Sequence, residues 1–147
     1  MILLCALAAG GGACRTSGPG DPETHIRAVM DAQVEAWNRG DIESYLEGYV
    51  KSPELIFASR GVFSRGWDPL LKRYQVAYPE GSMGTLRFDG VEVHVIDDEM
   101  AWVIGSWWLE MDGSTPHGAF TLVFKKTEEG WRIIHDHSSG VEVPAEE

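Results

Sequence analysis

The sequence predicts an α+β domain in which three N-terminal helices pack on a strongly curved antiparallel sheet. Two observations carry this prediction. Helical periodicity and helix-start signals are confined to residues 22–78, whereas residues 85–139 alternate between apolar and polar side chains with a period of two. Short polar turns separate the alternating segments, and turns of this kind join antiparallel neighbours. Helices followed by a run of strands are typical of the α+β class.

The helical half contains three start signals. Asp-Pro-Glu at 21–23 places a capping carboxylate, a helix-initiating proline and a favourable negative charge in order, so a helix is expected to run from there to Gly40. Asp41 is expected to cap a second, short helix. Asp-Pro at 68–69 repeats the first pattern before a third helix that includes residues 70–78 and stops at the next proline.

Six strands are expected. A short pair around a turn precedes the third helix, and four longer strands in a meander follow it. The expected strands cover residues 54–59, 61–64, 86–96, 100–111, 118–127 and 131–138.

The strand expected at 101–111 is apolar on both faces. Helices can cover only one face of a sheet, so the other needs a cover, and a second copy of the same sheet is the simplest one. We therefore expect a homodimer that forms through the sheet, the alternative being that termini or loops cover this face. One face carries Ala101, Val103, Gly105, Trp107, Leu109 and Met111, and the other carries Trp102, Ile104, Ser106, Trp108 and Glu110.

The chain divides into four segments. Residues 1–13 form a short apolar run that leads through small residues to Cys14, a pattern that resembles a bacterial lipoprotein signal with Cys14 as the lipidated residue. A flexible linker at 14–21, a domain at 22–139 and a C-terminal tail at 140–147 follow. This organisation implies an extracytoplasmic protein anchored to a membrane by lipid alone. The alternative is a disordered N-terminus.

Composition excludes several classes of function. The formal net charge is −11 and the 12 Lys and Arg residues are scattered, which argues against a nucleic-acid partner. The chain contains no glycine-rich phosphate loop, no nucleophile elbow and no CxxC pair. Nucleotide binding, serine acyl-enzyme chemistry and dithiol chemistry are therefore set aside, and no cofactor is expected.

The order of elements and two short motifs point to a family. Trp-Asn-Arg-Gly-Asp at 37–41, a helix led by Gly66 and the closing GWRIIHDHSS at 130–139 resemble the nuclear transport factor 2-like superfamily, and most closely its DUF4440/SnoaL-like group. The resemblance implies a cystatin-like cone with a pocket between helices and sheet. In this superfamily that pocket serves isomerases, cyclases, dehydratases, binding modules and oligomerisation domains.

Ketosteroid isomerase chemistry, which occurs in this superfamily, is not expected here. It needs a carboxylate base and protonated donors to an oxyanion. Alignment on the shared Gly-Asp pair places Phe57 at the base position and Gln33 at the position of the donor tyrosine. Neither side chain can perform the corresponding step.

The candidate catalytic residues are His135 and His137. Strict alternation would place both rings on the same face as Trp131 and Ile133. Either ring could transfer protons, whereas Asp136 would face away from them. Two imidazoles could also ligate a metal, but no third ligand is evident, so no metal site is assigned. The leading interpretation is structural: the rings hydrogen-bond across the sheet.

The pocket that this fold implies should be mainly apolar. Aromatic residues on the helix faces would form both core and pocket wall, which suits an apolar or ring-containing ligand. Glu110 could add an isolated carboxylate, although an exposed strand end is favoured for it, and Arg60 could meet an anionic group. The candidate pocket residues are Trp37, Tyr45, Tyr49, Trp67, Tyr74, Trp108, Glu110 and Arg60.

Three functions remain open. The leading one is a domain that binds a small organic molecule in the pocket, without established catalysis. The first alternative is a cofactor-free acid/base enzyme, an isomerase, cyclase or hydratase that uses His135 or His137. The second is a dimeric protein-association domain.

Overall fold

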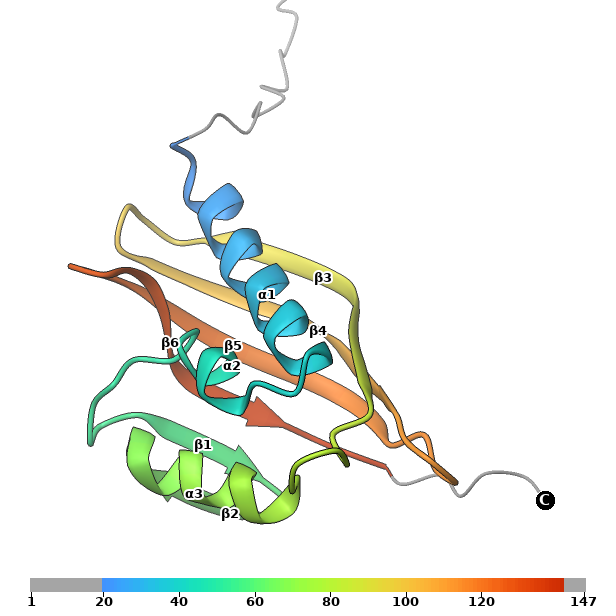
Figure 1. Ribbon diagram of the computed structural model, residues 1–147. Coiled ribbons are helices and arrows are strands. Elements are labelled where there is room, and N and C mark those ends of the chain that lie inside the picture. Colours follow the sequence, from blue (N-terminus) through green and yellow to red (C-terminus); the bar gives the residue numbers. More distant parts are fainter. Residues whose placement is uncertain (1–19, 142–147) are drawn as a thin grey trace, which may run out of the picture.

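The computed structural model describes residues 20–141 and contains three helices and one six-stranded sheet (Figure 1). The expected α+β class is confirmed, and every expected element is present. The helices are α1 (Pro22–Asn38), α2 (Ile42–Leu46) and α3 (Trp67–Ala77), and the strands are β1 (Ile56–Ser59), β2 (Val62–Arg65), β3 (Thr85–Val95), β4 (Met100–Glu110), β5 (His117–Thr127) and β6 (Gly130–Ser138).

The strand order is β2-β1-β6-β5-β4-β3, with long antiparallel strands from β3 to β6. The sheet is not wholly antiparallel as expected, because β1 runs parallel to β6 and pairs Phe57 with Asp136. This pairing joins segments almost 80 residues apart, which local turn signals could not predict. Figure 1 shows α1 lying across the long strands, and α3 beside β1 and β2.

The helix starts agree with the sequence in part. Asp41 caps α2 as expected, since its carboxylate accepts a hydrogen bond from the Ser44 amide at 2.9 Å. Asp21 occupies the cap position of α1 but its side chain makes no capping hydrogen bond. The third helix begins at Trp67, earlier than the expected Asp68 cap, because Gly66 adopts a φ of 92° and turns the chain directly into the helix.

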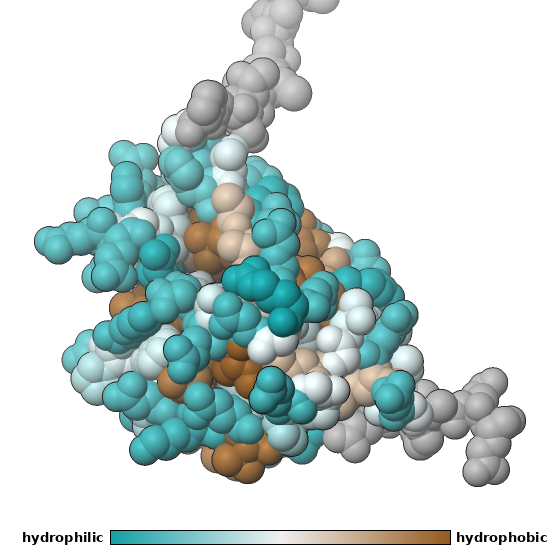
Figure 2. Space-filling model, viewed as in Figure 1, coloured by the Kyte–Doolittle hydropathy of each residue, from teal (hydrophilic) through white to brown (hydrophobic). Residues whose placement is uncertain are grey.

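The core lies between the helices and one face of the sheet. In β4, Val103 and Leu109 are buried under the helices, whereas Trp102 on the opposite face is 36% exposed. The helical side has a largely polar surface, with apolar residues visible between the elements (Figure 2). No helix within residues 20–141 is both long and apolar enough to cross a membrane. The most deeply buried large side chains of the core are Phe124, Ile26, Leu46, Leu55, Leu70, Ile133 and Val103.

A bulge interrupts the alternation of β6. Phe124 of β5 pairs with Ile133, whereas its neighbour Val123 pairs with His135, so Ile134 is an extra residue. The residues on the helix side before the bulge are odd-numbered and include Ile133, which is fully buried. After the bulge the even-numbered Asp136 is buried instead, with 4% of its surface exposed. The bulge therefore exchanges the faces of every later residue in the strand.

Candidate functional site

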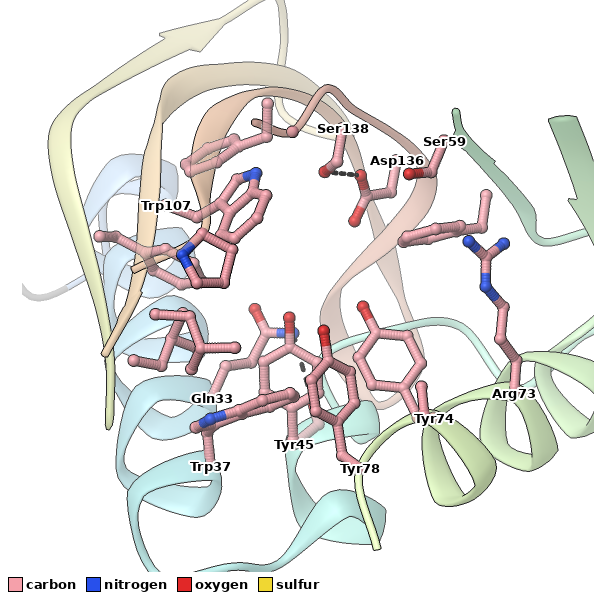
Figure 3. A pocket seen from close by; sticks show the side chains of 18 of the residues that line it. Gln33, Trp37, Tyr45, Ser59, Arg73, Tyr74, Tyr78, Trp107, Asp136 and Ser138 are labelled. Atoms are coloured by element: carbon pink, nitrogen blue, oxygen red, sulfur yellow. Dashed lines mark hydrogen bonds between the residues drawn. The ribbon is translucent and has the colours of Figure 1, made fainter. Parts of the chain in front are cut away.

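A cavity of about 260 Å³ lies between the helices and the sheet. The tyrosine hydroxyls in Figure 3 point into it from the helices, opposite Asp136 and Ser138 of β6. We call the exposed part of its lining the mouth, which consists of Arg60, Arg73, Ala77, Gly140 and Val141. The remaining lining residues are Gln33, Trp37, Tyr45, Tyr49, Phe57, Ser59, Tyr74, Tyr78, Leu86, Phe88, Trp107, Leu109, Pro116, Phe120, Leu122, Asp136 and Ser138.

Aromatic rings make up the helical wall of the cavity. Trp37 meets Tyr45 and Tyr78 edge to face, with ring centroids 5.1 and 4.8 Å apart, and Tyr74 lies 5.7 Å from Tyr45. Such pairs add stability beyond the burial of their area. Burial raises the pKa of the Tyr45, Tyr49 and Tyr74 hydroxyls, and the charge on Asp136 raises it further. These hydroxyls therefore stay neutral and can donate hydrogen bonds.

Asp136 is the one carboxyl group among the described residues that line the cavity. It accepts a hydrogen bond from the Tyr49 hydroxyl and another from the Ser138 hydroxyl, both at 2.7 Å. Burial raises the pKa of Asp136 to about 6, although both hydrogen bonds act in the opposite direction. A carboxyl group with this pKa can accept or release a proton near neutral pH.

Five of the eight candidate pocket residues line the cavity. Trp37, Tyr45, Tyr49 and Tyr74 do so from the helical side, as their helical spacing indicated. Arg60 does so from the turn between β1 and β2. The expectation that helix-face aromatics form pocket wall as well as core therefore agrees with the geometry.

Trp67, Trp108 and Glu110 do not line the cavity. Trp67 packs against the core, and its indole donates to the Leu46 carbonyl at 3.0 Å. Trp108 and Glu110 belong to the opposite face of β4, where Trp108 stacks on His117 with ring centroids 4.3 Å apart. Glu110 lies exposed at the strand end, as was favoured for it.

His135 and His137 lie outside the cavity too. Strict alternation from Trp131 was the wrong assumption, because the extra residue Ile134 turns both rings to the outer face of the sheet. Burial lowers the pKa of His135, and His137 lowers it further. Within residues 20–141, no three His, Cys, Asp or Glu side chains are grouped closely enough to hold a metal ion.

Gln33 and Phe57 do line the cavity. Gln33 is buried and donates from Nε2 to the Tyr45 carbonyl at 3.2 Å. Both positions therefore face the cavity, but an amide and a phenyl ring cannot serve as the donor and the base of a ketosteroid isomerase. The cavity does contain a carboxyl group and a hydroxyl group, those of Asp136 and Tyr49, but they come from positions other than 57 and 33.

Sequence reasoning missed Asp136, Ser138, Trp107 and Tyr78. Asp136 was assigned to the wrong face because a bulge leaves no clear local signal in the sequence. Trp107 could have been found, because it shares a face with Val103 and Leu109, which the helices cover. Its indole donates to the Ser139 carbonyl at 2.9 Å and joins the wall to the C-terminal segment.

The C-terminal segment reaches beyond the expected end of the domain at residue 139. Val141 exchanges two backbone hydrogen bonds with His117, at 2.7 and 3.0 Å. Gly140 and Val141, which were expected to belong to the tail, thus form one side of the mouth. Gly118 permits this close approach of the two backbones, since a Cβ atom there would overlap the Ser139 carbonyl.

A curved sheet that is covered by helices and encloses an aromatic cavity is typical of the cystatin-like fold, and comparisons place the chain within this class. Residues 26–145 match the model of the SnoaL-like domain family, so the chain belongs to that family. None of the curated proteins matches the chain.

Solved structures agree with this assignment. An NTF2-like protein of unknown function from Shewanella oneidensis is 39% identical, with a TM-score of 0.78 over 80% of this chain and 98% of its own. A nuclear transport factor 2-like superfamily protein from Salmonella enterica is 21% identical, with a TM-score of 0.67 over 84% and 94%. A ketosteroid isomerase-like protein from Erwinia carotovora is 18% identical, with a TM-score of 0.64 over 80% and 95%. The last two show likeness of fold alone.

Proposed function

We propose that this SnoaL-like domain binds a small, ring-containing organic molecule in the aromatic cavity. The observation that carries the proposal is the combination of a mainly apolar, aromatic wall with one buried carboxyl group, Asp136, and its two hydroxyl donors. Binding sites for small molecules are typically apolar, with a few convergent polar groups that orient the ligand. The volume of about 260 Å³ suits a ligand of one or two rings.

Native mass spectrometry of protein purified from its own cells tests this proposal. Wild type is expected to retain a small molecule. Ala77→Trp, which places an indole at the mouth, is expected to lose it, whereas the control Val76→Trp on the adjacent, 82% exposed position is expected to keep it. Failure of wild type to retain any molecule or to bind any member of an aromatic ligand panel would contradict the proposal.

Acid/base catalysis on the bound molecule is the second candidate function. We propose Asp136 rather than His135 or His137 as its proton carrier, because only Asp136 faces the cavity and its pKa is raised to about 6. Its carboxylate would take a proton from a carbon beside a ligand carbonyl and return it to the product, while the neutral Tyr49 hydroxyl orients the carboxylate.

Exchange of solvent deuterium into a bound cyclic ketone provides the test. Wild type is expected to exchange the hydrogens next to the carbonyl faster than Asp136→Asn, while His135→Gln exchanges them like wild type. Equal rates in wild type and Asp136→Asn, with the ketone bound by both, would exclude Asp136 as the proton carrier.

We also propose that two copies of the chain pair through the outer face of the sheet. Trp102, Ile104 and Val123 lie partly exposed on neighbouring strands of this face, and His94 stacks on Trp102 with ring centroids 3.8 Å apart. An exposed apolar area of this kind favours association. The same face would serve the alternative function, a protein-association domain.

The lipoprotein leader stays a prediction. Residues 1–13 and Cys14 lie outside the described residues. The mass of the N-terminal peptide of the mature protein tests the prediction, since cleavage before Cys14 and acylation of its thiol would both change that mass.

A further inference from the structure

We propose that the ligand is a small ring-containing carboxylic acid, whose carboxylate binds at the mouth to the guanidinium groups of Arg60 and Arg73. This inference rests on the proposed ligand-binding function and adds the chemical class of the ligand. The charged groups of the lining fall into two sets. Asp136 is a buried residue of β6, and the two arginines are among the exposed residues of the mouth.

The charge around the mouth is opposite to that of the chain. The whole sequence carries a formal net charge of −11, with only 12 Lys and Arg residues against 23 Asp and Glu. Two of those 12 line this one cavity, and Asp136 is the single acidic residue among its described lining. A local positive region in an acidic protein raises the concentration of an anionic ligand at that place.

Arg60 occupies a backbone position that does not favour arginine. It forms the two-residue turn between β1 and β2 together with Gly61, and both residues have positive φ, 52° and 76°. This combination is typical of a type I′ turn, which prefers Asn-Gly. Arg60 is the only non-glycine residue with positive φ in the described part of the chain, at a cost of about 1 kcal/mol. Local conformation therefore does not favour an arginine at this position, and the arginine is among the residues that line the cavity.

Arg73 reaches the same cavity from α3. Its guanidinium carbon lies 5.1 Å from the centre of the Phe57 ring, and Phe57 lines the cavity. A 3.4 Å hydrogen bond to the Ser64 hydroxyl engages one guanidinium nitrogen. Figure 3 shows the Arg73 side chain rising from α3 beside the tyrosines. Stacking on an aromatic ring leaves the edge of the planar group available, and that edge can contact both oxygens of a carboxylate.

The two sets of polar groups define how such an acid would lie. Its ring would pack among Trp37, Tyr45 and Tyr74, and its carboxylate would remain at the exposed mouth. A hydroxyl or carbonyl group on the buried part of the ring could then meet Asp136 and its donors. One or two guanidinium groups can saturate a carboxylate, so no further cation is required.

Calorimetric titration of the full chain with matched ligand pairs tests this inference. The probes are phenylacetate, 4-hydroxyphenylacetate and 3-phenylpropionate, each compared with its primary amide. The variants are Arg60→Asn and Arg73→Gln, and the control is Arg65→Gln, an exposed arginine of β2 that does not line the cavity. Arg60→Asn creates the favoured Asn-Gly turn, so it is expected to fold at least as well as wild type.

Wild type is expected to bind at least one acid more tightly than its amide. Each mouth variant should weaken binding of that acid about three- to tenfold and leave the amide unchanged, while Arg65→Gln has no effect. Equal affinity for acids and amides, unchanged in the variants, would overturn the ligand class and leave the proposed function standing. If wild type binds none of the six probes, the inference is wrong and the proposed function loses its support as well.

Discussion

Asp136 is the residue on which the chemistry of the cavity depends. Its carboxyl group is buried, and its two hydrogen bonds come from neutral hydroxyls rather than from a cation. Hydroxyl donors stabilise the carboxylate less than an ion pair does, so burial dominates and the pKa rises to about 6. A structural carboxylate in a core would more commonly have a cationic partner. This arrangement instead suits a group that orients a ligand or carries a proton.

The raised pKa of Asp136 predicts a specific dependence of stability on pH. A carboxyl group with a higher pKa in the folded state binds more protons when folded, so its contribution to stability falls as pH rises from 3.8 to about 6 and is level above. The free energy of unfolding of wild type, relative to Asp136→Asn, should therefore fall by up to about 3 kcal/mol between pH 4 and pH 7.

Urea unfolding of both proteins at several pH values measures this difference. Other carboxyl groups titrate in both proteins and cancel in the comparison. Tyr49→Phe provides a second check on the pKa of Asp136. The substitution removes a hydrogen bond that lowers this pKa, so thermal unfolding at several pH values should show the loss of stability extending to higher pH than in wild type. A difference between wild type and Asp136→Asn that is constant with pH would mean that the carboxyl is not perturbed by burial.

At the scale of elements, Gly140 and Val141, which follow β6, belong to the mouth and lie beside the start of β5. The segment after β6 continues beside β5 in the same antiparallel register and passes close to Gly118, and the Ser139 carbonyl accepts the indole hydrogen bond of Trp107. Ser139 also donates its amide to the Ala119 carbonyl at 2.9 Å. The wall of the cavity is thus connected to a segment that extends the pairing of β6 with β5 beyond Ser138.

Gly118→Ala is expected to release this segment. Its new Cβ would overlap the Ser139 carbonyl, so the backbone of the segment must move away, with a loss of stability of roughly 1–3 kcal/mol. Hydrogen–deuterium exchange at Ser139 and Val141 should become faster, and ligand affinity should fall. The control is Gly113→Ala, where a Cβ meets no atom within 4 Å and only its φ of 79° is strained. Equal exchange at Val141 in both variants would show that close packing at Gly118 is unimportant.

At the scale of the whole molecule, the two faces of the sheet differ in what covers them. The helices cover the face that bears the cavity, whereas the other carries Trp102, Ile104 and Trp108 without a covering element in the described chain. Arg87 lies over the Trp108 ring at 4.7 Å and His94 stacks on Trp102, so flat, partly polar side chains shield the largest rings. If the two proposals are correct, a mutation on the outer face should change dimer formation without changing ligand binding in the cavity.

Ile104→Arg is expected to separate the proposed dimer. A charge at the centre of the outer face would be buried without a partner on association, which costs several kcal/mol. Light scattering during gel filtration should give twice the chain mass for wild type and the single-chain mass for Ile104→Arg. Val76→Arg, on exposed α3, serves as the control and should remain dimeric. Wild type that is monomeric at micromolar concentration would contradict pairing through the sheet.

The sequence by itself determined the elements, their order and the α+β class. Those properties depend on local periodicity, on caps such as Asp41 and on short polar turns, all of which lie within a few neighbouring residues. Helical spacing also identified much of the aromatic wall, because residues that face the sheet from a helix must line any space left between the two.

Only the tertiary structure decided which carboxyl group enters the cavity. The bulge at Ile134 and the parallel pairing of β1 with β6 depend on contacts between distant segments, and a shift of one residue moves each later side chain to the other face. For that reason the histidines of HDHSS lie on the outer face and Asp136 lies inside. The same long-range packing brought Arg60, Arg73 and the segment around Gly140 into the lining of one cavity.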